Sequence, residues 1–352
     1  MQYGLFFQLP RSAAQDTATR YRETLEQIEL ADHLGFDSAW LAEMHFIPEF
    51  SILPAPLLVC AAAAARTERI RLGVAVALLP LHDPIRAAEE AATLDVISGG
   101  RLDYGVGRGS IRAHFDGFGI PIAERAERFN EAIDVIRLAW LDDPVSYEGR
   151  YLHYDAVNVE PKPLQRPGPP LWMAANSDES IERAGREGWP AMVSPITATR
   201  PELVQRVATF RTLREKLDGG PPPAAELAWL TVAHVAEDGD QARREVHDSL
   251  MSYLDVVKNT GRNSRERAGR ESAPKPTPVG RFAEMSYEQI LDEIAIVGSP
   301  AECREQLARV RDEFGVGHIL TWFNAGGQVP NDKVQRSMRL WIDEVAPAFV
   351  DA

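Results

Sequence analysis

Two kinds of hydrophobic pattern alternate from one end of the chain to the other. Short apolar runs, typical of buried strands, are each followed by a longer stretch with the 3.6-residue period of an amphipathic helix. The runs predicted as strands are Tyr3–Gln8, Asp37–Glu43, Ile70–Leu79, Leu102–Val106, Leu171–Ala175, Ala191–Ser194, Leu227–Val235 and His318–Phe323. The stretches predicted as the helices that follow them are Thr17–Leu34, Pro56–Arg66, Ile85–Ile97, Ala123–Leu141, Asp178–Arg186, Pro201–Leu217, Asp240–Leu254 and Asp332–Val345. Strands alternating with helices predict a parallel α/β sheet, and eight such units close a (β/α)8 TIM barrel, here one domain over residues 1–352.

Two segments interrupt this alternation. Residues Ser146–Glu160 alternate polar and apolar around Gly149, which predicts a hairpin inserted before the fifth strand. Residues Lys258–Arg281 are polar and basic and carry prolines at 274, 276 and 278, so we expect a long mobile loop over about 258–286, after the seventh strand. Such a loop either closes over a ligand at the active face or is a surface insertion, and both interpretations stay open. Helices over Tyr287–Ala295 and Ala301–Phe314 then lead into the last strand.

Composition narrows the class of protein. The net charge of -14 opposes binding to a nucleic-acid backbone. No apolar run is long enough to span a membrane, and the first predicted strand begins at Tyr3 without a basic targeting segment before it. The two cysteines, Cys60 and Cys303, lie far apart without metal-site spacing, which indicates a reducing compartment. We therefore expect a cytoplasmic enzyme or binding protein for a small molecule, with no metal site.

Ionisable residues follow the second predicted strand. The stretch from Trp40 to Phe46 ends the strand with Glu43, Met44 and His45. Parallel α/β proteins place their chemistry at the carboxyl ends of the strands. Taken alone, His45 would be interpreted as a hydrogen-bonded structural histidine. It becomes a catalytic candidate because the rest of the chain supplies a matching cofactor site.

Two turns are suited to phosphate. After the fourth strand, glycines at 105, 107 and 109 surround Arg108; glycine lets a backbone approach a ligand closely, and arginine suits phosphate. After the fifth strand, residues 175–180 (Ala-Asn-Ser-Asp-Glu-Ser) open a helix, whose free N–H groups attract anions. The second segment alone would be simple N-capping, but both turns together favour a phosphorylated cofactor. Small residues near 75–77 in the third strand leave room for a flat ring.

Two further features are structural expectations. Glu89, Asp95 and Arg101 are predicted to form an ion-pair network around the third helix and fourth strand. The run from Cys60 to Ala65 gives the second helix a surface of small side chains. Helix propensity alone would explain these alanines, but small residues also permit close helix contact, and we expect this helix at a dimer interface.

With these motifs in place, the chain resembles the bacterial luciferase-like monooxygenase family. The marks are W-L-A-E-M-H-F at 40–46, P-I-R-A-A-E-E-A-A-T-L-D at 84–95, S-G-G-R at 98–101, G-V-G-R-G at 105–109, and G-G with E-V-A-P between 326 and 347. The resemblance covers most of the chain. It implies a TIM barrel that binds reduced FMN at its carboxyl face and forms a homodimer through its second and third helices.

Site residues can be transferred from that resemblance position by position. It implies that Arg108 and Ser177 hold the FMN phosphate, with Asn176 and Ser180 as further contacts, and that the Ala75–Val76 peptide is cis beneath the flavin ring. His45 would act as acid–base and Glu43 would orient it. The residues expected to line the substrate are Phe6, Met44, Phe46, Ser110 and Trp322. Met44 departs from the family, because the luciferase pattern E-H-H-F has its catalytic histidine there, so light emission is not expected.

The resulting hypothesis is an FMNH2-dependent, two-component monooxygenase. A separate NAD(P)H:flavin reductase would supply FMNH2, since no nicotinamide-binding G-x-G-x-x-G opens a helix. Molecular oxygen would be the co-substrate and a C4a-hydroperoxyflavin the oxidant of a small organic substrate. Two alternatives remain: an oxidoreductase of the same family that uses coenzyme F420, and a non-catalytic flavin-binding protein.

Overall fold

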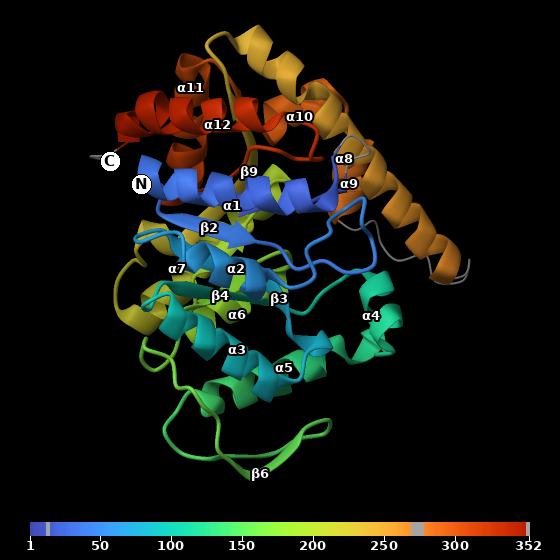
Figure 1. Ribbon diagram of the computed structural model, residues 1–352, viewed down its shortest axis with the longest axis vertical. Coiled ribbons are helices and arrows are strands. Elements are labelled where there is room, and N and C mark those ends of the chain that lie inside the picture. The colour runs from blue at the N-terminus through green and yellow to red at the C-terminus, as the bar shows by residue number, and fades with distance from the viewer. Residues whose placement is uncertain (12–14, 269–277, 350–352) are drawn as a thin grey trace.

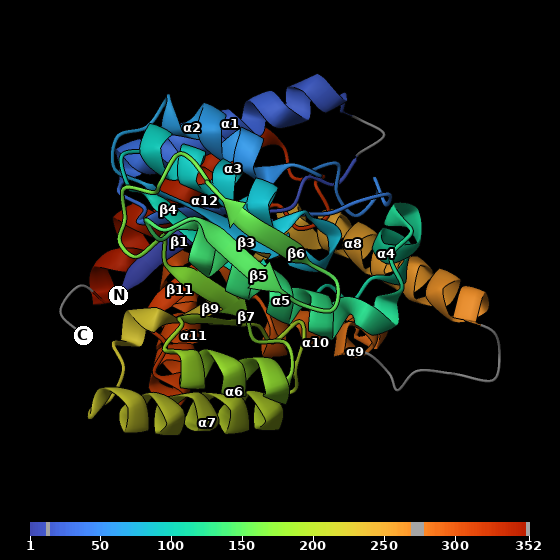
Figure 2. The same ribbon diagram turned by 90° about the horizontal axis from the view of Figure 1, so that it is seen from below.

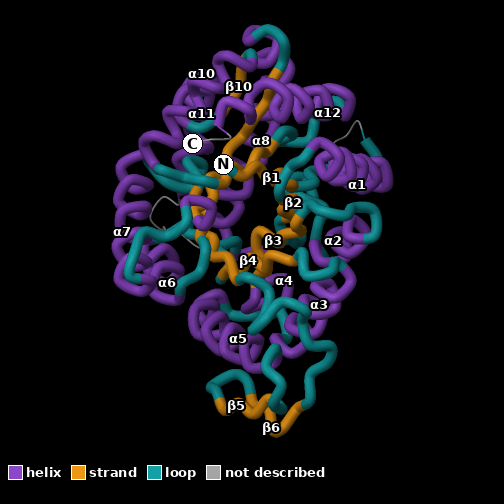
Figure 3. Tube along the Cα trace, turned by 90° about the vertical axis from the view of Figure 1, so that its left-hand side faces the viewer, coloured by secondary structure: helices purple, strands orange, loops and turns teal. Residues whose placement is uncertain are grey.

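Eight parallel strands form a closed barrel surrounded by helices (Figures 1 and 3). The computed structural model describes residues 1–11, 15–268 and 278–349, without side chains at 261–280. Around the barrel the order is β1-β2-β3-β4-β7-β8-β9-β11, and β11 pairs back onto β1. Their bounds are β1 Gln2–Phe7, β2 Ser38–Leu41, β3 Arg71–Leu78, β4 Leu102–Gly107, β7 Leu171–Ala174, β8 Ala191–Val193, β9 Leu227–Val235 and β11 His318–Trp322. The predicted TIM barrel is confirmed, with each of its eight strands in the predicted place.

The helices lie outside the barrel (Figure 2). Their bounds are α1 Thr17–Leu34, α2 Pro56–Ala64, α3 Pro84–Ile97, α4 Arg112–Phe118, α5 Arg125–Ala139, α6 Asp178–Glu187, α7 Arg200–Asp218, α8 Gly239–Ala268, α9 Pro278–Glu284, α10 Tyr287–Glu293, α11 Pro300–Phe314 and α12 Asn331–Leu340. Within the described ranges, every helix is too short or too polar to cross a lipid bilayer.

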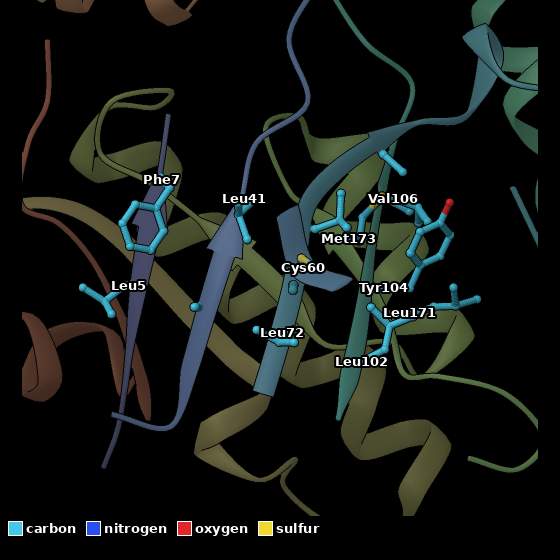
Figure 4. Close-up of a cluster of buried hydrophobic side chains, with 14 of the residues drawn as sticks. Leu5, Phe7, Leu41, Cys60, Leu72, Leu102, Tyr104, Val106, Leu171 and Met173 are labelled. Atoms are coloured by element: carbon cyan, nitrogen blue, oxygen red, sulfur yellow. The ribbon is translucent and has the colours of Figure 1, made fainter. Parts of the chain in front are cut away.

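Alternation along the strands separates two layers of core. In β1, Leu5 and Phe7 point outward into the cluster beneath the helices, whereas Phe6 points into the barrel. Figure 4 shows part of the outer cluster, where side chains of β1, β2, β3, β4 and β7 meet. The inner cluster contains Trp40, Trp172 and Trp322, so the barrel is filled with aromatic side chains rather than being a pore.

The predicted inserted hairpin is confirmed. Strands β5 (Val145–Glu148) and β6 (His153–Val157) pair antiparallel and lie away from the barrel at the foot of Figure 1. A short strand, β10 (Ile296–Gly298), was not predicted. It pairs in parallel with the end of β9, outside the closed ring.

The predicted long loop over 258–286 is wrong for most of its described residues. Helix α8 continues to Ala268, and residues 278–284 form α9. Extending an existing helix needs no new nucleus, so polar residues with adequate helix propensity can continue it without an apolar face. Residues 269–277, with prolines 274 and 276, lie outside the described residues.

The predicted ion-pair network of Glu89, Asp95 and Arg101 is also wrong in the described part of the chain. Buried Asp95 accepts two hydrogen bonds from Gln165, from the backbone N (2.9 Å) and from Nε2 (2.7 Å). Arg101 donates to the carbonyl oxygens of Ala64, Thr67 and Ile70 at 2.9 to 3.0 Å. Arg101 thus joins the end of α2 to the start of β3 through backbone contacts, which charge spacing in a sequence does not reveal.

Candidate active site

Glu43 and His45 lie together in the loop that follows β2, and Glu43 also contacts a histidine that follows β3. The Glu43 Oε1 atom accepts hydrogen bonds from Nε2 of His45 at 2.7 Å and from Nε2 of His82 at 2.8 Å. Its other oxygen accepts the backbone N–H of Leu78 at 3.0 Å. Glu43 is buried, and these three donors compensate for its desolvation.

These contacts set the protonation of the cluster. Burial by itself would raise the pKa of Glu43, but the hydrogen bonds from His45 and His82 and the charge of His82 hold that pKa at about 2. Burial lowers the pKa of His82, but its bond to Glu43 and that carboxylate's charge together raise it above its ordinary value. Because Glu43 fixes Nε2 of His45 as a donor, Nδ1 is the atom of this ring that can exchange a proton with a ligand.

Helix α4 brings a third histidine to the cluster. His114 is buried, and its Nε2 accepts the backbone N–H of His45 at 3.4 Å, while its Nδ1 has no hydrogen-bond partner. Burial, and then the charge of His45, lower the pKa of His114 to about 4, so this ring is neutral at physiological pH. Phe118 of the same helix lies edge-on to His45, with ring centroids 4.9 Å apart. Helix α4 therefore packs directly over the catalytic candidate.

The turn after β4 meets the start of α6, and these are the two turns that the sequence predicted to bind phosphate. Arg108 pairs with Glu179 at 2.7 Å and lies 3.4 Å from the hydroxyl of Ser177. Ser177 and Ser180 form a reciprocal capping box at the N-terminus of α6. Asn176 is exposed, and its side chain accepts a hydrogen bond from Thr197. Since Glu179 is mostly exposed, its pair with Arg108 is weak enough for a phosphate to replace it.

The middle of β3 has the expected unusual backbone. The peptide bond between Ala75 and Val76 is cis, as the resemblance implied, and the pairing of β3 with β4 shifts register between Val74 and Ala77. Ala75 and Val76 are only half-buried, although their neighbours on both sides are buried. A side chain at Gly107 would meet Val76 at 2.5 Å, so the glycine allows this close approach. The cis peptide and the half-buried Ala75 and Val76 lie at the strand where the sequence predicted room for a flat ring.

The five predicted substrate residues divide into two groups. Phe6, Met44 and Trp322 are buried together in the inner cluster, and the rings of Phe6 and Trp322 meet edge-on at 5.5 Å. Phe46 and Ser110 are exposed beside α4, and Phe46 packs against Phe118 with ring centroids 5.2 Å apart. Phe46 is 58% exposed, unusual for an aromatic side chain. The first group can form the wall of a pocket and the second its rim.

Comparison with known proteins shows the family of this chain. The family described as "Luciferase-like monooxygenase" matches residues 1–318. The chain belongs to this family. It is 38% identical to an uncharacterised protein, y4vJ, of Sinorhizobium fredii, over 96% of this chain and 94% of that one. It is 27% identical to the oxygenase component of flavin-dependent trigonelline monooxygenase from Acinetobacter baylyi, over 100% of this chain and 96% of that one. The crystal structure of monooxygenase RslO1 from Streptomyces bottropensis superposes with a TM-score of 0.86 at 28% identity, covering 99% of this chain and 100% of that one.

For this luciferase-like monooxygenase, sequence reasoning missed His82, His114 and Phe118. His82 comes four residues after the end of β3, beyond a short turn over Leu79–Leu81, and its place near a strand end is a signal that could have been used. His114 and Phe118 had no such signal, because the short helix α4 was not predicted. Within the described ranges, no cluster of three or more His, Cys, Asp or Glu residues could hold a metal ion, so we interpret the contacts of Glu43 as hydrogen bonds.

Proposed function

We propose that this luciferase-like monooxygenase is the oxygenase component of a two-component system that uses FMNH2 and molecular oxygen to oxidise a small organic substrate. The observation that carries the proposal is the buried Glu43–His45 pair, bonded at 2.7 Å at the same end of the barrel as the Arg108–Ser177 turn. The trigonelline enzyme, named as an oxygenase component, supports a separate reductase as partner.

The chain's residues have distinct parts in this proposal. Bound FMNH2 would supply the activation of oxygen. Arg108, Ser177 and the N-terminus of α6 would bind its phosphate, with Asn176 and Ser180 as weaker contacts. Ala75 and Val76 would lie against its ring. His45 would hold or release a proton at Nδ1 while Glu43 fixes its orientation, as a general acid–base requires.

The aromatic surroundings serve a second purpose. Phe6, Met44 and Trp322 would form an apolar wall that excludes water from the reacting atoms, and Phe46 and Ser110 would contact the substrate at the rim. Met44 offers no second histidine at the position where luciferases have one, so chemistry without light emission is expected.

We also propose a homodimer formed through α2 and α3, in the cytoplasm. Support comes from apolar side chains that these helices expose: Leu58 of α2 is 73% exposed, and Val96 and Ile97 at the end of α3 are 41% and 55% exposed. Both cysteines are buried and free, in keeping with a reducing compartment.

The experiment that tests the proposal is rapid mixing of oxygen with the anaerobic complex of protein and FMNH2. We expect a clear delay before the absorbance of oxidised flavin appears, and substrates should be found by the compounds that shorten it. Immediate oxidation with one equivalent of hydrogen peroxide would contradict the proposal. Affinities for FMN, FMNH2 and coenzyme F420, measured side by side, would then separate an F420 oxidoreductase from a flavin-binding protein.

A further inference from the structure

A buried arginine near the catalytic face has two unpartnered donor atoms. Arg20, in the first turn of α1, is only 6% exposed, and its Nε and Nη2 atoms make no hydrogen bond to any residue that the structure describes. Burial lowers the pKa of Arg20, opposed by the charge of Glu23. The carboxylate of Glu23, however, accepts its hydrogen bond from Gln15. A buried guanidinium without a hydrogen-bonding anion is costly, and arginine cannot escape the cost by losing its proton.

Arg20 lines a small cavity where the carboxyl ends of β1 and β11 meet α1. The cavity has a volume of about 20 Å³, and none of the side chains that line it is acidic. Two other lining residues have unpartnered buried atoms, Oε1 of Gln8 and Nε1 of Trp322. The amide of Gln8 can present either its oxygen or its NH2 group. Asn324, also in the lining, is already bonded through its side chain to the backbone of Val329.

In the loop after β11, a glycine lies against the guanidinium of Arg20. Gly326 and Gly327 have φ values of +85° and +76°, which other residues rarely adopt. A Cβ atom at Gly327 would lie 2.1 Å from Nη2 of Arg20 and 2.7 Å from Pro10. The loop after β11 can therefore close over the guanidinium only because it has no side chain there.

We propose that Arg20, Gln8 and Trp322 form a binding site for a carboxylate group, and that the substrate of the proposed monooxygenase carries this group. A cavity of about 20 Å³ accepts one oxygen atom or a water. The cavity that Arg20 and Trp322 both line has a guanidinium and an indole N–H to offer, and a guanidinium gives the charge-assisted hydrogen bonds that carboxylates accept. Phe6 and Trp322 belong both to this lining and to the inner cluster. A bound carboxylate would therefore place its organic part against the apolar wall. The substrate half of this inference rests on the proposed function; the anion site does not.

The test is calorimetric titration of the flavin-free protein with formate, acetate and benzoate. We expect saturable binding by the wild type and by a control variant, Arg22→Gln, which alters an exposed arginine of the same helix. Arg20→Gln should bind about 10- to 100-fold more weakly, because it loses a charged hydrogen-bond donor. Trp322→Phe keeps the charge and removes only the indole N–H. Trp322→Phe should weaken binding about 3- to 10-fold. If Arg20→Gln does not fold, Trp322→Phe still tests the site.

The outcomes separate the possible occupants. Absence of saturable binding by the wild type, or equal binding by both site variants and the wild type, would mean that the cavity holds water, and the site would be disproved. Binding of formate but not of acetate or benzoate would leave a site for a free anion and overturn the substrate class. Because no flavin or oxygen is used, each result is independent of the rapid-mixing experiment. If rapid mixing shows no delay but calorimetry shows carboxylate binding, the monooxygenase proposal is rejected and the anion site is kept.

Discussion

At the scale of single residues, one carboxylate organises the site. Glu43 accepts from His45 of its own loop, and from the backbone of Leu78 at the end of β3 and from His82 just beyond it, so its position is fixed by two neighbouring segments of the barrel. Two histidines therefore share one anion, and only His45 also contacts α4 through His114 and Phe118. The chemistry assigned to His45 depends on this geometry rather than on the residue type.

Replacing His45 with Gln should separate catalysis from binding. We expect the ratio of oxygenated product to hydrogen peroxide to fall about 100-fold, the range of a lost general acid–base. Affinity for FMN should stay nearly unchanged, since His45 is not among the phosphate contacts. Product and peroxide are measured with any substrate the wild type oxidises, and His153→Gln on the exposed hairpin is the control. Wild-type product yield in His45→Gln would refute the role.

The ionisation of Glu43 should also make the free energy of unfolding depend on pH. Its pKa is about 2 in the folded protein against 4.5 ordinarily, so its ionised form stabilises the fold above pH 4.5. That contribution, about 3 kcal/mol, is lost as the pH falls from 4.5 towards 2. The raised pKa of His82 acts in the opposite direction, with stability present below pH 6.5 and lost as the pH rises through the raised value.

The measurement is urea unfolding of wild type and Glu43→Gln between pH 6 and pH 3. The difference in free energy of unfolding should be largest at pH 5 to 6 and should shrink steadily below pH 4.5. Glu49→Gln, at an exposed site, should show no such trend. A difference that stays constant with pH would mean that Glu43 is not held ionised.

Arg108 is the residue on which phosphate recognition should depend. Arg108→Leu should weaken FMN binding about 10- to 100-fold, the loss expected for a charged hydrogen bond, and should leave riboflavin binding unchanged because riboflavin has no phosphate. Flavin fluorescence titration compares the two ligands. Equal losses for FMN and riboflavin would show that Arg108 acts on the ring or on the fold instead.

At the scale of elements, α2 and α3 expose the apolar side chains of Leu58, Val96 and Ile97 at the proposed dimer interface. Leu58→Asp and Ile97→Asp would each place a charge in the proposed dimer interface, where no partner charge is available. Sedimentation velocity should show a dimer for the wild type and mostly monomer for either variant. Leu217→Asp, at an exposed apolar position of α7, is the matched control. A dimer that survives both interface substitutions would place the contact elsewhere.

At the scale of the whole molecule, barrel closure brings distant segments into one site. The first strand pairs with β11 as well as β2, so residues near both ends of the chain meet at the carboxyl face. A ligand bound there should stabilise the complete barrel. FMN at 100 times its dissociation constant should add about 2.7 kcal/mol to the free energy of unfolding and raise the unfolding temperature by a few degrees.

Scanning calorimetry with and without FMN measures this shift. For the wild type, riboflavin at the same concentration should raise the unfolding temperature less than FMN does. For Arg108→Leu, FMN and riboflavin should both give this smaller rise in unfolding temperature. An unfolding temperature that does not respond to FMN would argue against a flavin site in the barrel.

The sequence by itself determined the barrel and the place of its site. The eight strands appear as apolar runs because both faces of a parallel strand are buried, and this signal is local. Glu43, His45 and Arg108 follow such strands, so the strand order alone assigns them to one end. The cis peptide at Ala75–Val76 was expected only from the resemblance to the family, because no local sequence pattern reveals it.

Only the tertiary structure decided which side chains meet. His82 and His114 join Glu43 and His45 from the segment after β3 and from α4, and Arg20 lines one cavity together with Gln8 and Trp322. The same holds for Arg101, which donates to backbone carbonyls and to the hydroxyl of Thr67 rather than to the acids near it in sequence. Hydrogen-bond geometry and burial arise from packing between segments far apart in the chain. A periodic pattern reports only the face a residue occupies, and it does not report the neighbour that the residue contacts there.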